Sequence, residues 1–248
     1  IYVIGKDIMR FHSIYWPIFL MALGEPLPKK VFGHPWLLFG EDKMSKSKGN
    51  VLYADDLARH FTVDGVRHYV LSEMPYASDG SITYESLIGR YNADLANNLG
   101  NLVKRTVDMT GKYFGGVIQV PNAAEPIDDE LRAAVRDAVS RSREQMDSYH
   151  VADASETVFG LFRRANKYID ETTPWVLAKD ESRRERLGTV LYNLLETIRI
   201  GAVLLAPFMP DTSKRILAQL ATDEHTVEFG ALKAGDTLAP SEVLFARI

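Results

Sequence analysis

Residues 1–8 read IYVIGKDI, a run of β-branched and aromatic side chains that stops at Gly5. Such a run is typical of an interior parallel strand, which other elements cover on both faces. A helix is predicted to follow, because Asp7 can cap it and Gly24 can end it. Pro17 falls inside this helix and is predicted to kink it or to stop it early.

A second apolar strand is predicted at residues 31–39, so strand, helix and strand form one crossover unit of a doubly wound sheet. After residue 54 helical periodicity predominates, and the sequence predicts an α/β part followed by an all-α helix bundle. The predicted helices cover residues 55–60, 64–73, 85–113, 128–149, 152–172, 183–205 and 207–221. The predicted domains are a Rossmann-like part at 1–54, connective helices and a loop at 55–83 with a turn at 78–80, the bundle at 84–223, and a tail at 224–248 that packs back on the body.

The composition is that of a folded globular protein, with 46% apolar and 25% charged residues. The chain has no cysteine, which excludes disulfides and thiolate metal sites, and its six histidines form no ligand pair. We therefore expect no tightly bound metal in this chain. The net charge is −4, so contacts with nucleic acid have to come from local patches.

No apolar run reaches the roughly 18 residues that a membrane span needs, and the start lacks the basic segment of a signal peptide. We expect a cytoplasmic protein without membrane contact. The chain begins inside an apolar strand without an initiator methionine. We therefore expect a fragment of a longer polypeptide, with more of the sheet upstream.

The loop after the second predicted strand reads KMSKSKGN at 43–50. The ammonium groups of Lys43 and Lys46 lie beside the hydroxyls of Ser45 and Ser47. Lysine carries a compact charge on a flexible stem, which suits a polyphosphate whose charge changes during a reaction. A nucleoside triphosphate is the predicted ligand, and a solvated basic surface loop is the alternative.

The turn after the first strand is a second candidate for ligand binding. Ligands of open α/β sheets sit beyond the carboxyl ends of the strands, where Gly5 allows close approach and Asp7 can accept hydrogen bonds from a ribose. The alternative is a tight turn and a helix cap. Phe11 and His12 begin an aromatic cluster on the helix, which is either a pocket wall or part of the core.

A polar stripe is predicted on the first helix of the bundle. Asn97, Asn101 and Arg105 are four residues apart and cover an arc about 80° wide, facing away from the leucines of the helix. Amides and a guanidinium can hydrogen bond to unstacked bases, and Trp175, after a proline, can stack on one. The alternatives are a solvated polar face and a tryptophan of the core.

Together these residues resemble the bacterial-type methionyl-tRNA synthetases, a family of class I aminoacyl-tRNA synthetases. The loop at 43–47 is similar to the second signature of the class, and the resemblance covers essentially all 248 residues. The other similar motifs are GKDI at 5–8, FH at 11–12, WP at 16–17, DLAN at 94–97, the segment 98–105 and TPW at 173–175.

The resemblance implies the ligation of methionine to its tRNA. Methionine and ATP, as its magnesium complex, give methionyl-adenylate and pyrophosphate, and the methionyl group then passes to the 3′ end of methionine tRNA. Lys46 is implied as the catalytic cation, with Lys43 in support. The implied ATP-binding residues are Gly5, Asp7, Lys43, Ser45, Lys46 and Ser47.

The resemblance also assigns two recognition surfaces. Phe11 and His12 are implied in the methionine pocket, with Tyr15 and Trp16 as further candidates. The implied anticodon-binding residues are Asn97, Asn101, Arg105 and Trp175. Candidates for contacts with tRNA phosphates are Arg163, Arg164, Lys167, Arg183 and Arg184, for which a solvated surface is the alternative reading.

Two features of the family are absent from the sequence. The first class I signature, of the His-x-Gly-His type, is missing, as is the zinc-bearing insertion. We therefore expect this chain to need an N-terminal catalytic half as its partner and to be inactive alone. The alternatives are a non-catalytic tRNA-binding or scaffold protein derived from a synthetase, and another class I synthetase.

Overall fold

The computed structural model describes residues 1–40, 42–45, 49, 51–73 and 78–248. The chain divides into two compact units, one of Ile1–Tyr53 with Glu73–Tyr84 and one of Ala54–Ser72 with Glu85–Ile248. The stretch 55–83, expected to be connective, is divided between them. The fold class predicted from the sequence, an α/β part and a helix bundle, is confirmed.

The first unit contains the predicted crossover. Strand β1 (Tyr2–Gly5) pairs in parallel with β2 (Val31–His34), so that Gly5 lies opposite His34. The chain between them forms a 3₁₀ turn η1 (Lys6–Ile8), a π-helical turn η2 (Phe11–Tyr15) and the helix α1 (Trp16–Leu23). Gly24 ends α1 in the left-handed conformation, with φ of 72°, as predicted.

The structure differs from the prediction at the start of this crossover. Asp7 does not cap the helix, because Gly5 is the N-cap residue and Asp7 lies within η1. Of the two effects predicted for Pro17, an early stop does not occur, since Pro17 lies in the first turn of α1 directly after the wider π turn. In this chain β1 has β2 as its paired strand, and Ile1 and Val3 are exposed, so the interior position of β1 stays a prediction.

The predicted strand at 31–39 is two strands that belong to different sheets. It breaks at Pro35, which has no N–H to donate to a ladder. Strand β3 (Leu37–Phe39) pairs antiparallel with β4 (Asp42–Lys43) and parallel with β5 (Gly80–Ile82). The turn predicted at 78–80 therefore gives way to a strand from Gly80 onward, because β3 supplies a partner far away in the sequence.

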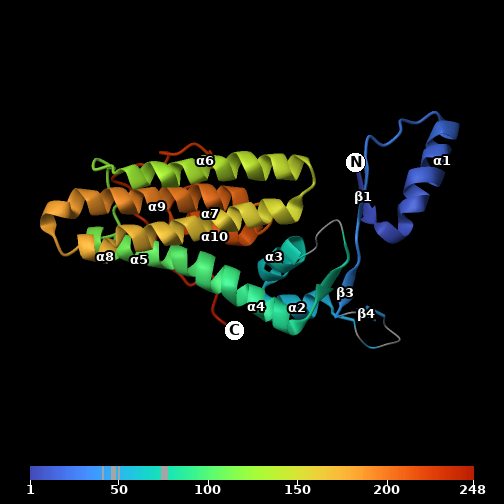
Figure 1. The fold of residues 1–248 in the computed structure, drawn as a ribbon, viewed down its shortest axis with the longest axis horizontal. Coiled ribbons are helices and arrows are strands. Elements are labelled where there is room, and N and C mark those ends of the chain that lie inside the picture. Colours follow the sequence, from blue (N-terminus) through green and yellow to red (C-terminus); the bar gives the residue numbers. More distant parts are fainter. Residues whose placement is uncertain (41, 46–48, 50, 74–77) are drawn as a thin grey trace. The chain divides into compact units, whose positions relative to one another are not determined.

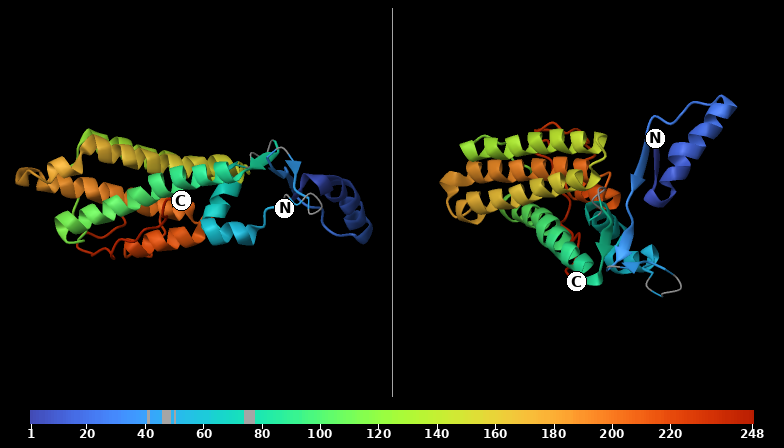
Figure 2. Two further views of the ribbon diagram at one scale, coloured as in Figure 1. Left: turned by 90° about the horizontal axis from the view of Figure 1, so that it is seen from below. Right: turned by 45° about the vertical axis from the view of Figure 1, so that its right-hand side comes forward.

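The second unit is helical (Figures 1 and 2). Its helices are α2 (Ala54–Phe61), α3 (Val63–Glu73), α4 (Tyr84–Arg90), η4 (Tyr91–Gly100), α5 (Asn101–Phe114), α6 (Pro126–Asp147), α7 (Val151–Thr172), α8 (Pro174–Leu177), η5 (Glu181–Arg183), α9 (Arg184–Leu205) and α10 (Pro210–Gln219). Helices α4, η4 and α5 follow one another without a break, and η4 has π-type hydrogen bonding. The sequence missed the one-turn helix α8.

Helix α9 is the centre of the bundle. Figure 1 shows it between α6 and α7, and it also packs against α5 and α10. The helical stretch Glu181–Leu205 is long and apolar enough to cross a membrane, but 89% of its apolar window is buried inside the bundle. A helix that is apolar all round and covered on every side is the core helix of a bundle.

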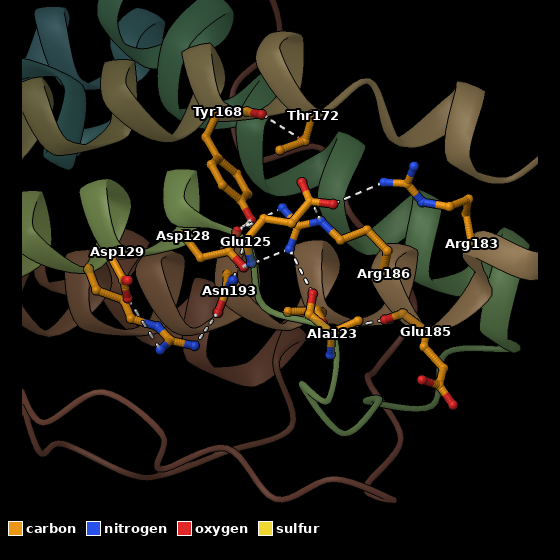
Figure 3. A network of polar contacts seen from close by, with 12 residues as sticks. Ala123, Glu125, Asp128, Asp129, Tyr168, Thr172, Arg183, Glu185, Arg186 and Asn193 are labelled. Atoms are coloured by element: carbon orange, nitrogen blue, oxygen red, sulfur yellow. Dashed lines mark hydrogen bonds and ion pairs between the residues drawn. The ribbon is translucent and has the colours of Figure 1, made fainter.

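A buried polar network joins the ends of three helices (Figure 3). Asp128 of α6 is fully buried and takes two hydrogen bonds from Arg186 of α9, at 2.6 and 2.8 Å, and one from the Tyr168 hydroxyl of α7 at 2.6 Å. Glu125 and Asp128 form a capping box, and Glu125 also pairs with Arg186. Each charged group here is paired, which a buried ion pair needs in order not to destabilise the fold.

Candidate functional site

The lysine segment begins in strand β4. Lys43 is exposed there, and its ammonium lies 4.2 Å from the centre of the Trp36 ring. Met44 and Ser45 follow at the surface, half-buried. Lys46, the predicted catalytic lysine, and Ser47 lie outside the described residues.

The turn after β1 reaches the same indole. The Lys6 ammonium lies 4.4 Å from the Trp36 ring centre and 2.5 Å from Asp79 Oδ1. The hydrogen bond from Lys6, together with one from the Trp36 N–H, holds the pKa of Asp79 below its ordinary value. Trp36 is fixed further by its carbonyl, which accepts a hydrogen bond from the Gly80 N–H. The two predicted nucleotide-binding segments, the turn after β1 and the lysine segment, thus meet at the Trp36 ring.

Gly5 and Asp7 are neighbours in space as well as in sequence. A Cβ at Gly5 would lie only 2.5 Å from Asp7 Oδ1, so a larger residue would displace the carboxylate. Asp7 is exposed and stands one residue after Lys6. The turn therefore offers a carboxylate and an ammonium side by side, as a ribose and a phosphate require.

The structure brings the predicted methionine-pocket residues together in two pairs, His12 with Trp16 and Phe11 with Tyr15. His12 and Trp16 line an open pocket of about 410 Å³ along strand β1. The Trp16 indole N–H donates to the Tyr2 hydroxyl, and the Tyr2 ring contacts His12 edge-on. Phe11 does not line this pocket: it is 57% exposed and its ring lies against Tyr15.

The polar stripe is present on the long helix of the second unit. Asn97 and Asn101 are exposed, and Arg105 is half-buried with its guanidinium 6.0 Å from the centre of the Trp175 ring. Trp175 is 40% exposed and is not a residue of the core. A cation and an indole at the surface, next to two amides, form a platform on which a base can stack.

The corner that carries Trp175 is rigid. Thr173 has a φ of 43°, Pro174 is buried at the first position of α8, and Thr173 N–H bonds to Ile169 O at 2.9 Å. One turn earlier on α7, Tyr168 is fastened by the buried network of Figure 3. The network therefore supports the end of α7, directly before the short helix α8 that carries Trp175.

A second buried group supports the stripe helix from the other side. Asp94 of η4 lies 3.1 Å from His68 Nε2 of α3 and 3.0 Å from the Arg90 guanidinium. Burial raises the pKa of Asp94, but the hydrogen bonds and charges of His68 and Arg90 outweigh burial, and the pKa lies below its ordinary value. The anchored Asp94 fixes the turn of η4 that presents Asn97.

The basic residues proposed for phosphate contacts are engaged within the protein. Each lies close to an acidic side chain or a backbone carbonyl: Arg163 pairs with Glu156, Arg164 with Glu130 and Glu171, Lys167 with Glu171, Arg183 with Glu125, and Arg184 with Glu181 and Tyr113 O. Paired cations are weaker attractors of phosphate than unpaired ones, since the neighbouring carboxylate offsets the charge.

Sequence reasoning missed Lys6, Trp36 and Asp79 as members of the lysine site. The signal for Lys6 was its place between Gly5 and Asp7, but the pairing with Asp79 joins residues that are 73 positions apart. In the part of the chain that the structure describes, no group of three or more acidic, histidine or cysteine side chains could hold a metal ion.

Two models of known protein families match this chain. The model of class I tRNA synthetases of the M type matches residues 1–107. The model described as the anticodon binding domain of methionyl tRNA ligase matches residues 120–248, more than half of the chain. This chain belongs to the methionyl-tRNA synthetase family.

Individual members of the methionyl-tRNA synthetase family match over the whole chain. The methionine–tRNA ligase of Clostridium perfringens is 53% identical and that of Caldanaerobacter subterraneus 49% identical, each over 100% of this chain. The structure of Mycobacterium tuberculosis methionyl-tRNA synthetase in complex with methionyl-adenylate has a TM-score of 0.93 at 38% identity and covers 99% of this chain.

The chain spans only part of each of these proteins. It covers 39% and 40% of the two ligases and 49% of the Mycobacterium tuberculosis chain. The two family-model matches establish the family, and they confirm the resemblance drawn from the sequence motifs.

Proposed function

We propose that this chain serves the charging of tRNA with methionine, and that its second unit binds the anticodon loop. The observation that carries the proposal is the exposed stripe of Asn97, Asn101 and Arg105, with Arg105 next to the Trp175 indole. Unstacked bases of an RNA loop are recognised by hydrogen bonds to their edges and by stacking on aromatic side chains. Amides and an indole–guanidinium pair meet both needs.

The first unit, in this proposal, holds the triphosphate of ATP during methionine activation. An oxygen of the methionine carboxylate forms a bond to the α-phosphorus, the bond to the bridging oxygen breaks, and pyrophosphate leaves with the electron pair. Negative charge builds on the phosphate oxygens, and cations that meet this charge lower the barrier. Lys43 supplies one such cation, and we assign the principal role to Lys46 from the signature.

The other contacts of the activation site follow from the turn after β1. Gly5 and Asp7 bind the ribose in this proposal, and Lys6 adds a cation beside them. Mg²⁺ arrives with ATP as part of the substrate. Ser45 and Ser47 hydrogen bond within the loop, while Phe11 and His12 contribute to the methionine pocket of the complete site.

The test of the anticodon assignment is binding of methionine tRNA compared with the same tRNA carrying a changed anticodon. We expect the changed tRNA to bind at least tenfold more weakly, and equal binding of the two would refute the assignment. Trp175→Ala should weaken binding of the cognate tRNA by about 1–3 kcal/mol, the value of one stacked base. Trp16→Ala, an exposed tryptophan of the first unit, is the matched control and should leave binding unchanged.

The test of the catalytic part is methionine-dependent exchange of pyrophosphate into ATP. We expect negligible exchange from these 248 residues, because the sequence has no His-x-Gly-His type signature. Substantial exchange without an added N-terminal piece would contradict that expectation. The second candidate is a tRNA-binding protein without catalysis, for which exchange stays absent even when the remainder of a synthetase is supplied.

A further inference from the structure

The indole of Trp36 lies against two ammonium groups of the first unit. The Lys43 ammonium lies 4.2 Å and the Lys6 ammonium 4.4 Å from the centre of the ring. The two nitrogens are therefore at most about 9 Å apart, which is within the screening length of about 10 Å in 0.1 M salt, so the two charges repel each other. Trp36 itself is uncharged, so it can contribute to phosphate binding only through these two lysines.

The backbone that carries the ring is fixed. The Trp36 N–H donates to Asp79 Oδ1 at 2.9 Å, and the Trp36 carbonyl accepts a hydrogen bond from the Gly80 N–H at 2.9 Å. The next residue, Leu37, lies opposite Gly80 in the parallel pairing of β3 with β5, and the preceding Pro35 is buried. The ring therefore projects from a held piece of backbone, which a residue that positions others requires.

The register of β3 and β4 places Lys43 beside the ring. Lys43 of β4 lies opposite Leu38 of β3. Trp36 stands two residues before Leu38, so along an extended chain the two side chains point to the same side. Residues on one face of an antiparallel pair that are offset by two stay within reach of aromatic and long side chains. The contact between Lys43 and Trp36 thus follows from the strand register.

Lys6 reaches the same ring from the turn after β1. Its ammonium also lies 2.5 Å from Asp79 Oδ1, the oxygen that accepts the Trp36 N–H. An ammonium has three N–H donors, so the bond to Asp79 does not use all of them. Asp79 therefore fixes both the ring and Lys6, and it leaves donors of Lys6 for a ligand.

The ring offsets the repulsion between the two lysines. The face of an indole is negative and attracts an ammonium, and tryptophan does so more strongly than tyrosine or phenylalanine. One ring that contacts two ammonium groups favours the arrangement in which both lie close together over one in which the side chains point apart. A ligand that binds two cations already in place has to immobilise less side-chain freedom.

We propose that Trp36 is a positioning residue for the triphosphate, whose ring holds the ammonium groups of Lys6 and Lys43 as a pair for neighbouring phosphates of one ligand. The inference rests on the proposed function, in which the first unit holds the triphosphate of ATP. It extends that function to an uncharged residue that acts through two lysines.

The experiment measures binding of inorganic tripolyphosphate to the 248-residue chain by isothermal titration calorimetry. Trp36→Leu should weaken binding by about three- to tenfold, because both ammonium groups lose the ring that holds them. Trp36→Phe keeps an aromatic face and should weaken binding by less than about threefold. Phe19→Leu removes an exposed ring of α1 in the same unit, and as the matched control it should bind like the wild type.

A double-mutant cycle separates positioning from a purely structural role. In the Lys43→Gln background the ring holds one cation instead of two, so Trp36→Leu should have only about half of its effect on the logarithm of the affinity. An undiminished effect in that background would overturn the inference, because the ring would then act through the fold. With isotope-labelled lysine, nuclear magnetic resonance should show the ε-methylene protons of Lys6 and Lys43 shifted upfield by the ring in the wild type and not in Trp36→Leu.

The possible outcomes separate this inference from the proposed function. If the wild-type chain does not bind tripolyphosphate, the triphosphate function of the first unit fails and the inference fails with it. If the wild type binds and Trp36→Leu binds within about twofold of it, the function stands and Trp36 is not a positioning residue. Circular dichroism of each variant shows whether loss of fold causes weaker binding, and Trp36→Phe tests the ring if Trp36→Leu does not fold.

Discussion

Helices α1 and α9 are both strongly apolar, yet they have opposite surroundings. In α9 nearly every residue is buried, including charged ones such as Arg199, whereas Leu20 is the buried residue of α1. Phe19 of α1 is 60% exposed, and Met21 and Leu23 are exposed beside it. An apolar stretch becomes core only where other elements cover it, and in the described part of the first unit they do not cover α1.

The two units also differ in where their charged side chains lie. The second unit buries four charged residues in closed networks, with Asp128, Arg186, Glu196 and Arg199 each paired. In the first unit the ammonium groups of Lys6 and Lys43 lie at the surface against the Trp36 ring, and Lys6 is paired with Asp79. The buried pairs therefore contribute to the stability of the second unit, and the cations of the first unit stay in contact with solvent.

The largest effect should come from opening the buried network. Arg186→Met leaves the Asp128 carboxylate buried without its guanidinium, and we expect the second unit to lose about 3–5 kcal/mol of unfolding free energy. Chemical denaturation followed by hydrogen exchange over residues 85–248 measures the loss. Arg136→Met, at an exposed arginine of α6, is the control, and an equal loss there would show that the network is not the cause.

A direct comparison of the two helices uses one truncation in each. Leu194→Ala in α9 removes a fully buried side chain and should cost about 2–5 kcal/mol. Phe19→Ala in α1 removes a larger side chain but should change the stability by less than about 0.5 kcal/mol, because that ring is mostly in water already. Comparable losses at the two positions would mean that α1 is covered after all.

Acid should weaken the second unit more than the first. Asp94 and Asp128 have pKa values below the ordinary one; for Asp128 burial raises the pKa, but Arg186, Tyr168 and the Glu125 N–H outweigh it. Stability from such groups is fully present above the unfolded pKa of about 3.9 and is lost as the pH falls through the folded pKa.

The measurement is the urea midpoint of each unit between pH 6 and pH 2, read from peptide-resolved hydrogen exchange. The steepest fall for residues 85–248 should come below about pH 4. Asp128→Asn should flatten this fall, since asparagine does not titrate. A midpoint that is independent of pH in the wild type would contradict the assigned pKa shifts.

The smallest effect is expected at the Trp36 ring, which the ammonium groups of Lys6 and Lys43 contact. Trp36→Leu removes cation–π contacts worth about 0.5–1 kcal/mol each, so the side chains of Lys6 and Lys43 lose the ring that covers them and should be acylated faster. Mass spectrometry of partially acetylated protein gives the rates residue by residue. Lys179, an exposed lysine of the second unit that is 143 positions from Trp36, serves as the internal reference and should keep its rate.

The parts of the fold that sequence could predict are those with local causes. The helical period located the continuous helix of α4, η4 and α5, and also α6, α7 and α9, within a few residues, and the freedom of glycine at positive φ marked the end of α1 at Gly24. The stripe from Asn97 to Arg105 follows from the same period. These features depend on neighbours three or four positions away, which the sequence displays directly.

The parts that could not be predicted depend on partners far along the chain. Strand β5 forms because β3 lies beside it, and Asp79 meets Lys6 across 73 positions. A hollow that Asn97 and Arg247 both line joins residues 150 positions apart, which the sequence did not show either.

The two buried ion pairs of α9 also fix its register. Arg186 engages α6 near one end of the helix, and about 20 Å further along Arg199 and Glu196 hold the backbone of residues 226–232. A slip of one residue would turn α9 by about 100° and withdraw both arginines from their partners at once. The helix can therefore dock in the bundle in a single rotational position.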